Sequence, residues 1–298
     1  EALQVGEVDT GTADVFFNLD EVLDDDFRHP IPLGIAGIDN LLKGGLAKGE
    51  IGVILAPTGV GKTTVLSKIA NNAFNLGYNV LQIFFEDNPK IIQRKHFTMW
   101  TKIAPDNLSL QREEVLEKVK QIKENAPNRL ILKKLPSDTL TMNQIKNQMR
   151  KMIAEGIKLD LVVVDYIDCI VPDKNLGDEW KSEGSVMRGF ESMCHELDIA
   201  GWTATQGNRS SISSEVVTTD QMGGSIKKAQ VGHVIISIAK SLQQKEMNLA
   251  TIAITKSRIG KDGIVFENCK FDNEMIEIDT DSSVTFLGME EQKEEKNK

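Results

Sequence analysis

The residues with the clearest chemistry form a glycine-rich loop, APTGVGKT, at positions 56–63. The loop matches the phosphate-binding pattern G-x-x-x-x-G-K-[ST] except that Ala56 replaces the first glycine. Its amides and the N-terminus of the following helix would cradle phosphates, because the helix dipole favours negative charge there. Lys62 would reach the β- and γ-phosphates, and the Thr63 hydroxyl would bind Mg²⁺. An ordinary glycine-rich turn is the alternative. We expect ATP or another nucleoside triphosphate to be held by Ala56, Pro57, Thr58, Gly59, Val60, Gly61, Lys62, Thr63 and Thr64.

Two acidic residues follow apolar runs that have strand character. Asp165 ends the run LVVVD at residues 161–165, and a charge at the end of a buried strand is costly without a partner such as a metal ion. Glu86 follows the run at residues 80–85, a strand that we expect beside the phosphate-loop strand. Its carboxylate would orient and deprotonate the attacking water. The alternatives are an Asp that caps a turn and an exposed Glu that opens a helix.

A polar amide and two cations also stand at strand ends. The run at residues 199–205 leads into Gln206, at a position where ligands bind in open α/β sheets. Its amide would sense the γ-phosphate or the water; a loop amide is the alternative. Lys256 and Arg258 follow a later run, and strand alternation would put them on one side. Such a pair suits the transition-state charge of phosphoryl transfer, including transfer from a nucleotide held by a neighbouring subunit. A solvated basic turn is the competing interpretation.

These residues need a sheet that brings strand ends together. Short apolar runs alternate with helical patterns, which predicts an α/β fold with a mainly parallel sheet covered on both faces. The runs lie at residues 51–56, 80–85, 130–132, 159–165, 199–205, 231–239, 249–255 and 264–271, and the helical patterns at 63–76, 88–103, 112–124, 141–155 and 179–197. Thr141 and Gln144 form a capping box at the start of the fourth helix. The last runs have no helical pattern between them, which predicts late antiparallel strands.

Composition limits the classes of protein to which the chain can belong. It has 298 residues, of which 40% are hydrophobic and 27% charged, enough for a sizeable core. No apolar stretch approaches the roughly 18 residues of a membrane span, which excludes a bilayer protein. Three scattered cysteines argue against a disulfide framework and a zinc site and favour a reducing cytoplasm. Since the net charge of −9 repels nucleic acid, DNA or RNA must bind at a local basic patch or loop.

The two ends of the sequence differ from its middle. Residues 1–28 are acidic, but Val15, Leu19, Val22 and Leu23 recur at helical spacing, which predicts a linker with a short amphipathic helix. Residues 29–283 would form one ATPase domain, and residues 284–298 a charged, disordered tail. The sequence begins with Glu1 and not with methionine, which indicates a fragment or a processed product.

The motifs occur in the order found in one family of motor proteins. The sequence resembles the C-terminal domain of DnaB-like hexameric replicative helicases, especially phage versions, over about residues 30–280. The resemblance implies a RecA-like ATPase core that hydrolyses a nucleoside triphosphate with Mg²⁺, translocates on single-stranded DNA as a hexameric ring and unwinds duplex. The motifs that carry it are IPLG at 31–34, GID at 37–39, GGL at 44–46, the phosphate loop, FE at 85–86, VDY at 164–166, QGNR at 206–209, GSI at 224–226 and KSRIG at 256–260.

The resemblance also implies roles for single residues. Glu86 becomes the catalytic base, Asp165 the Walker B carboxylate and Gln206 the sensor that couples nucleotide to DNA. Lys256 and Arg258 become cations that act on the neighbouring subunit's nucleotide. Two DNA loops fall at residues 172–183 and 208–225, with Lys174, Lys181, Asn208, Arg209, Gly223, Gly224 and Ser225 as DNA-binding residues and Lys227 and Lys228 as further basic candidates. The sequence has QMGG at 221–224 where many relatives carry Arg-Glu-Ser-Gly, so only backbone contacts to phosphate transfer there.

The resemblance implies partners and leaves rival functions open. Most members carry an N-terminal domain that forms a collar and binds primase, whereas only residues 1–28 precede the motor here, either because that domain was removed or because it never existed. A primase and a helicase loader are implied partners, and the implied location is the cytoplasm, of the host cell if a phage encodes the protein. One rival is a RecA- or KaiC-type ATPase without unwinding activity. The other is a nucleotide-gated DNA-binding or loading factor that scarcely turns over.

Overall fold

The fold is built on a single sheet. The structure, a computed structural model, describes residues 23, 28–173, 179–208, 210–211, 214–222, 226–280 and 284–286. In these residues ten strands follow the order β10-β8-β7-β6-β1-β5-β4-β2-β3, with β9 paired to β8. They are β1 (Ile51–Ala56), β2 (Val80–Phe84), β3 (Leu130–Lys134), β4 (Leu161–Asp165), β5 (Ala200–Gln206), β6 (Val234–Ala239), β7 (Leu249–Ser257), β8 (Ile264–Asp272), β9 (Glu277–Asp279) and β10 (Val284–Phe286).

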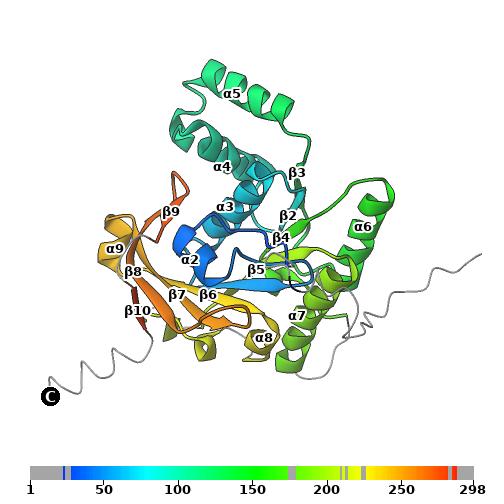
Figure 1. Ribbon diagram of the computed structural model, residues 1–298, viewed down its shortest axis with the longest axis vertical. Helices are drawn as coiled ribbons and strands as arrows, with labels where there is room; N and C mark the ends of the chain where they lie inside the picture. Colours follow the sequence, from blue (N-terminus) through cyan, green and yellow to red (C-terminus); the bar gives the residue numbers. More distant parts are fainter. Residues whose placement is uncertain are drawn as a thin grey trace, which may run out of the picture.

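The pairing confirms the predicted α/β class. Strands β1 to β6 pair in parallel, whereas β7 pairs antiparallel with β6 and β8, and β9 and β10 pair antiparallel with β8. Parallel strands need helical crossovers, and the helices between them cover both faces of the sheet (Figure 1). The described helices are α2 (Ala36–Leu41), α3 (Lys62–Asn75), α4 (Pro89–Thr101), α5 (Arg112–Asn125), α6 (Met142–Ala154), α7 (Glu179–Glu196), α8 (Ile226–Val231) and α9 (Leu242–Glu246), with short 3₁₀ turns η1 (Pro105–Asn107), η2 (Ile167–Cys169) and η4 (Thr219–Gln221).

Strand alternation divides the core into two apolar clusters. All six residues of β1 are buried, which explains why the strand reads as a continuous apolar run. Ile54 joins the cluster that contains Leu66 of α3, whereas Leu55 joins the cluster that contains Phe190 of α7 and Ile145 of α6. Helix α6 begins at the predicted capping box, in which the Gln144 amide N–H donates to Thr141 Oγ1 at 3.4 Å. Helix α5 packs on α4, far from the sheet's centre (Figure 1).

The structure corrects three expectations about the elements. Strand β2 does not neighbour β1, because β5 and β4 lie between them. Residues 226–231 form helix α8, so the strand expected from residue 231 begins at Val234. Residues 284–286, expected at the start of a disordered tail, form strand β10. The predicted amphipathic helix near residues 15–23 lies outside the described residues except for Leu23, which is exposed.

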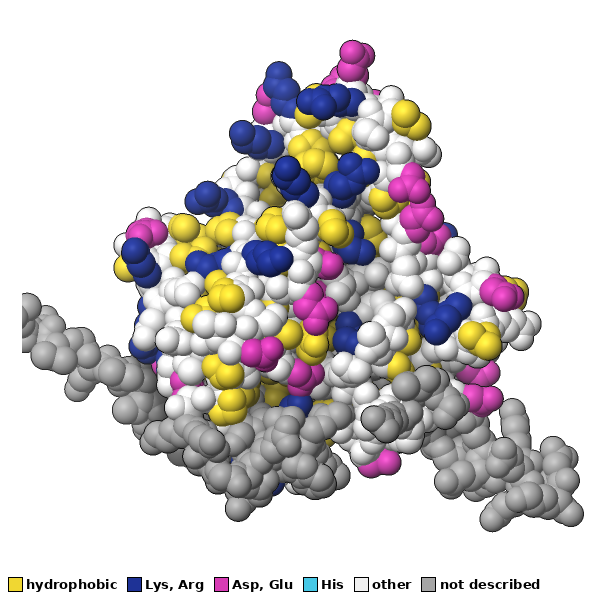
Figure 2. Space-filling model, turned by 180° about the vertical axis from the view of Figure 1, so that it is seen from behind, with side chains coloured by type: hydrophobic (Ala, Val, Ile, Leu, Met, Phe, Trp, Pro, Cys, Tyr) yellow, Lys and Arg dark blue, Asp and Glu magenta, His cyan; other side chains and the backbone are white. Residues whose placement is uncertain are grey.

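The charges are unevenly distributed over the surface. Seen from behind, basic side chains gather around exposed apolar ones on the upper part of the molecule, which carries α4 and α5 (Figure 2). The chain therefore presents local basic regions despite its net charge of −9. Among the described residues, no helix combines the length and the hydropathy that a bilayer crossing requires.

Candidate nucleotide site

A cavity of about 320 Å³ opens at the C-terminal ends of the parallel strands. Register places the strand ends together: Ala56 lies beside Gln206 on β5, and Phe84 lies beside Asp165 on β4. Residues that are far apart in the sequence therefore share one cavity. Its lining residues are Thr58, Gly59, Gly61, Lys62, Thr63, Thr64, Phe84, Glu86, Asp87, Asp165, Tyr166, Gln206 and Asn273.

The phosphate loop has the conformation that its glycines allow. Gly61 has a φ of +126°, and a Cβ built there would lie 2.4 Å from Asn273 Oδ1, so a side chain does not fit. The Lys62 ammonium donates to the carbonyl oxygens of Ala56 (3.1 Å) and Pro57 (3.2 Å). Burial lowers the pKa of Lys62, and the nearby Asp165 carboxylate opposes that shift. The loop thus holds a partly desolvated cation at its mouth, an arrangement suited to phosphate oxygens.

Asp165 is a buried carboxylate at the end of β4. Burial raises its pKa to about 6, a hydrogen bond with the Thr63 side chain opposes this rise, and the nearby charges of Asp87 and Glu86 add to it. The raised pKa means that the surrounding groups do not fully compensate its negative charge. A hydroxyl and a carboxylate side by side are hard oxygen donors of the kind that Mg²⁺ prefers. The residues present therefore fit the predicted metal site.

Glu86 reaches the cavity although its strand is not next to β1. Strand β2 ends at Phe84 and helix α4 begins at Pro89, and the short connection between them places Glu86 in the lining of the cavity. The Tyr166 hydroxyl donates to Glu86 Oε1 at 3.0 Å. The Asn88 side chain caps α4 by accepting from the Lys90 amide at 2.9 Å. These bonds fix an exposed carboxylate opposite the phosphate loop.

Gln206 is anchored through its backbone by Asp168. The Gln206 amide N–H donates to Asp168 Oδ2 at 3.2 Å, and the Thr205 hydroxyl donates to the same carboxylate at 3.0 Å. Asp168 also forms an ion pair with Lys228, whose side chain is 4% exposed. This burial corrects the interpretation of Lys228 as a candidate basic group on a DNA loop, because its ammonium faces the interior.

Lys256 and Arg258 lie at the opposite end of the parallel strands from the phosphate loop. Ser257 lies beside Val234, and Val234 lies beside Gly52, near the beginning of β1. Arg258 is therefore separated from Ala56 by about five residues along the strand direction, or about 17 Å. The predicted cations share one side, as expected, but the fold does not bring them to the cavity of their own chain.

Both cations bind the end of helix α8. Lys256 Nζ donates to the carbonyl oxygens of Ala229 (2.6 Å), Gln230 (2.9 Å) and Gly232 (2.7 Å). The Arg258 guanidinium donates to the Gln230 oxygen at 2.7 Å, and Arg258 is otherwise exposed. Cations at a helix C-terminus interact favourably with the helix dipole.

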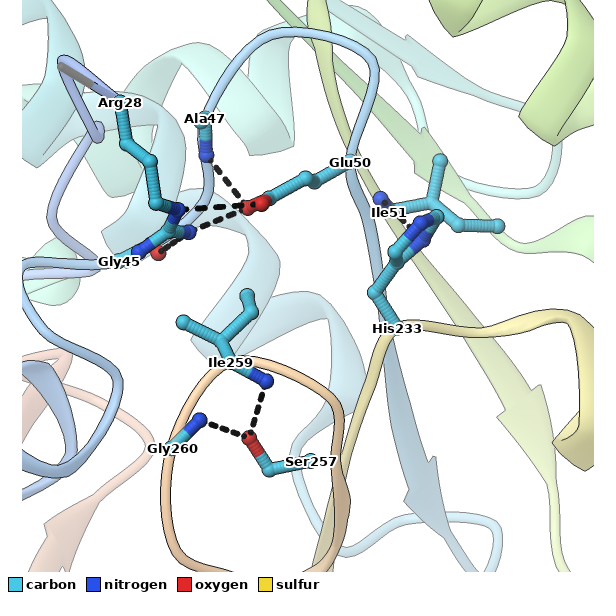
Figure 3. Close-up of polar contacts among 9 residues, drawn as sticks. All are labelled: Arg28, Gly45, Ala47, Glu50, Ile51, His233, Ser257, Ile259 and Gly260. Atoms are coloured by element: carbon cyan, nitrogen blue, oxygen red, sulfur yellow. Dashed lines mark hydrogen bonds and ion pairs between the residues drawn. The ribbon is translucent and has the colours of Figure 1, made fainter. Parts of the chain in front are cut away.

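The turn that carries Arg258 is rigidly built (Figure 3). Ser257 Oγ accepts from the amides of Ile259 (3.2 Å) and Gly260 (2.9 Å), and a Cβ on Gly260 would lie 1.9 Å from the Leu41 carbonyl oxygen. His233 Nδ1 accepts from the Ile51 amide at 3.2 Å, and burial lowers the pKa of this histidine. Arg28 pairs with Glu50 at 2.6 Å in the same region, so the chain enters the domain at this end of the strands (Figure 3).

The predicted DNA-binding residues are only partly described. Lys174, Arg209, Gly223, Gly224 and Ser225 lie outside the described residues, and Lys181 is placed only as part of α7. Asn208 Oδ1 accepts from Ser210 Oγ at 2.6 Å and from the Ser211 amide at 3.3 Å, so it stabilises its own turn. The Gln221 side chain donates to Ser214 Oγ at 2.8 Å.

Several residues in or behind the cavity were not among the predicted site residues, and three of them hold other residues in place. Asn273 lines the cavity after β8 and accepts from Thr64 Oγ1 at 2.9 Å, and nothing local in the sequence marks it. Tyr166 lines the cavity and holds Glu86, whereas Asp168 lies behind it and holds Gln206. Both follow Asp165 within three residues, so their place after a strand end was the available signal.

Comparisons with known proteins point to one family. A family model for the DnaB-like helicase C-terminal domain matches residues 30–280. A DnaB-like replicative helicase of Enterobacteria phage T4 is 21% identical over 243 residues, which is 77% of this chain and 50% of the phage protein. The replicative DNA helicase DnaB of Buchnera aphidicola subsp. Baizongia pistaciae (strain Bp) is 26% identical over 189 residues, 59% of this chain and 40% of its own length. The chain thus spans about half the length of these relatives or less.

Solved structures share the fold. One solved ATPase domain superimposes with a TM-score of 0.73 at 18% identity, covering 88% of this chain and 94% of that domain. A DnaB-like replicative helicase, solved in a study of its interactions with primase, gives a TM-score of 0.72 at 17% identity, covering 84% of this chain and 61% of the other. These likenesses confirm the predicted RecA-like ATPase fold.

Proposed function

Since this chain belongs to the DnaB-like helicase C-terminal domain family, we propose that it is the motor of a replicative DNA helicase. In this proposal it hydrolyses ATP or another nucleoside triphosphate, translocates on single-stranded DNA as a ring and unwinds duplex. The observation that carries the proposal is the cavity in which Lys62, Thr63, Glu86, Asp165 and Gln206 meet. A glycine-rich turn of purely structural role would not need these side chains to converge.

Each group in the cavity has a distinct task in hydrolysis. The loop amides and Lys62 bind the phosphates, and the Glu86 carboxylate, held by Tyr166, accepts a proton from the attacking water. The Gln206 amide, at the end of β5, senses the γ-phosphate. Thr63 and Asp165 would hold Mg²⁺, and the bound ion would supply positive charge to the phosphate oxygens. Most of the catalytic effect comes from positioning and electrostatic stabilisation, because phosphoryl transfer needs little covalent chemistry from the protein.

Lys256 and Arg258 act on the nucleotide of the adjacent subunit. Their position, about 17 Å along the sheet from the phosphate loop, argues against action on their own nucleotide. Arg258 is exposed and stands on a rigid turn, as a residue that reaches across an interface must. The proposal therefore includes a homo-hexamer in which each nucleotide lies between two subunits.

DNA and protein partners complete the proposal. Single-stranded DNA would contact Lys174, Lys181, Asn208, Arg209 and the backbone of residues 223–225. A primase and a helicase loader are the expected protein partners, and the site of action is the cytoplasm. Residues 1–28 serve as a linker to a neighbouring subunit, residues 29–283 as the motor, and the final residues, beyond β10, as a charged tail.

Strand displacement on a forked substrate tests the proposal. The wild-type chain should hydrolyse ATP faster with single-stranded DNA and separate the fork, and Lys62→Ala should do neither. Lys146→Met is a matched control, because it removes a lysine ion pair with Glu196, neither of which lines the cavity, and it should leave both activities intact. ATP hydrolysis without unwinding would favour the RecA- or KaiC-type rival, and DNA binding with almost no turnover would favour the loading factor.

DNA affinity provides a second measurement. Labelled oligonucleotide should bind more tightly with a non-hydrolysable ATP analogue than without it, and binding should weaken with salt because phosphate contacts release counterions. Equal affinity with and without the analogue would refute the coupling between nucleotide and DNA.

A further inference from the structure

Helix α8 lies between residues that the proposed function assigns to two different nucleotides. Its six residues begin directly after Ser225, at the end of the second predicted DNA loop. On one side, Lys228 forms an ion pair with Asp168, the carboxylate that anchors the backbone of Gln206. At its C-terminal end, its carbonyl oxygens bind Lys256 and Arg258. A single short helix therefore contacts both sets of residues.

The contact toward the chain's own nucleotide passes through Asp168. This carboxylate accepts from the Thr205 hydroxyl, the Gln206 amide and the Lys228 ammonium. Lys228 is 4% exposed and Asp168 24%, so the ion pair is largely shielded from water. Breaking a buried pair by removing one partner leaves an uncompensated charge, which is strongly unfavourable. Helix α8 is thus firmly attached to the strand end that carries Gln206.

The contact toward the adjacent nucleotide passes through the end of α8. Lys256 Nζ lies within 2.9 Å of three carbonyl oxygens there, two of them from Ala229 and Gln230 of the helix itself. Arg258 shares the Gln230 oxygen at 2.7 Å. Any rotation or shift of α8 must move these acceptors, and with them the preferred positions of both cations.

We propose that Lys228 and Asp168 are positioning residues that link, through α8, the Gln206 strand end to the cations acting on the next subunit's nucleotide. This inference rests on the proposed function and adds to it a route between successive sites of the ring. Within the part of the chain that the structure describes, Asp168 and Lys228 are both absent from the residues that line the cavity, so the proposal gives them a positioning role and not a catalytic one.

Three variants test the link. Lys228→Met removes the ammonium, Asp168→Asn keeps the size and one oxygen acceptor, and the double variant removes the pair. Each single variant should lower kcat for DNA-stimulated ATP hydrolysis roughly tenfold or more, since small misplacements of catalytic groups are costly. KM for ATP should change less than about threefold in Lys228→Met, because this variant keeps the phosphate loop and the Asp168 charge that acts on Lys62. The double variant should lose no more than the worse single variant, as expected for residues that act together.

Mixed rings separate the two arms of the link. The reference is a mixture of Lys62→Ala and Arg258→Ala protomers. Mixing the double variant Lys228→Met/Arg258→Ala with Lys62→Ala leaves live sites in which only the site's own Gln206 anchor is altered. Mixing Lys228→Met/Lys62→Ala with Arg258→Ala leaves live sites in which only the incoming Arg258 is altered, and the fraction of live sites equals that of the reference in both mixtures. Both mixtures should hydrolyse ATP clearly more slowly than the reference. A mixture that equals the reference would show that one arm does not depend on α8, which would overturn the link.

Controls distinguish this inference from the proposed function and from simple unfolding. Lys146→Met carries the same substitution in another ion pair and should keep wild-type kcat. Thermal unfolding shows which variants are folded. If Lys228→Met does not fold, the kcat of Asp168→Asn tests the link in its place. If the wild-type chain itself shows no DNA-stimulated hydrolysis, the proposed function fails. If it does and the folded variants match it, only the link fails.

Discussion

The position of Arg258 makes a demand that mixed rings can test. Arg258 lies level with the first residues of β1 but two strands away, beyond β6, whereas the phosphate loop follows the last residue of β1. Five residues of strand span about 17 Å, and two intervals between strands add roughly 10 Å sideways. The resulting separation, about 20 Å between Cα atoms, is well beyond the reach of an arginine side chain. If Arg258 takes part in hydrolysis, it must do so in the next subunit.

Pure rings of Arg258→Ala and of Lys62→Ala should each be nearly inactive. Arginine groups that act across an interface contribute about 10³–10⁵ to the rate, because they stabilise charge that grows in the transition state. In a random equimolar mixture, about one quarter of the interfaces in a closed ring combine an intact Lys62 with an intact Arg258 from the neighbour. ATP hydrolysis should therefore recover to about one quarter of the wild-type rate, provided that the sites fire independently. Unwinding should stay low, since translocation needs successive sites.

The assay is steady-state phosphate release after the two variants have been dissociated and reassembled together. Sedimentation or mass measurement of differently tagged protomers shows whether they share rings. If co-assembled rings remain as inactive as the pure ones, Arg258 does not act across the interface, and the ring-motor mechanism loses its main support. Full activity of pure Arg258→Ala rings would remove the residue from the mechanism altogether.

Three further predictions concern the cavity and the linker. Glu86→Gln should keep nucleotide affinity while turnover falls by roughly 10²–10⁴-fold, measured by single-turnover hydrolysis; near-normal turnover would assign the base elsewhere, such as to Asp87. Burial raises the pKa of Asp165 from its usual 3.8 to about 6. The folded, nucleotide-free protein is therefore most stable with Asp165 protonated, and its free energy of unfolding should fall as pH rises through about 6 and the carboxyl ionises. Asp165→Asn should therefore raise the melting temperature of the nucleotide-free protein at about pH 8, and an unchanged melting temperature would contradict the raised pKa. The same variant should abolish stabilisation by Mg²⁺ with nucleotide. In the wild type, that stabilisation should weaken below about pH 6, where Asp165 becomes protonated. Residues 1–28 join the domain where Arg28 pairs with Glu50, in the same region as Arg258. Deleting them should weaken assembly of the ring, since the aliphatic side chains of Val15, Leu19, Val22 and Leu23 would contribute roughly 1.5–3 kcal/mol each when buried against a neighbour. An unchanged mass by sedimentation would mean that these side chains fold onto their own domain.

Local patterns in the sequence were enough for the strands of the parallel part of the sheet, for helices α3 to α7, and for several of the residues that line the cavity. The first four of the five buried residues of β4 form an apolar run, and Asp165 stands out at its end because a buried charge there needs a partner. The phosphate loop is recognisable because its glycines and Lys62 must follow one another at fixed spacing. The capping box of Thr141 and Gln144 is local too, since both bonds form within one helical turn.

The tertiary structure alone decided which of these residues meet. Strand order is set by crossovers and packing over long separations, so the place of β2 beyond β5 and β4 left no mark in its own residues. The same holds for the pairing of Lys228 with Asp168, 60 residues apart, and for the contact of Asn273 with Thr64, 209 residues apart. It also holds for the placement of Arg258 level with the N-terminal ends of the parallel strands, which follows from the antiparallel direction of β7. Spacing within a segment records which neighbours a residue has along the chain, whereas contacts between segments depend on register and direction, which emerge only when the whole sheet is assembled.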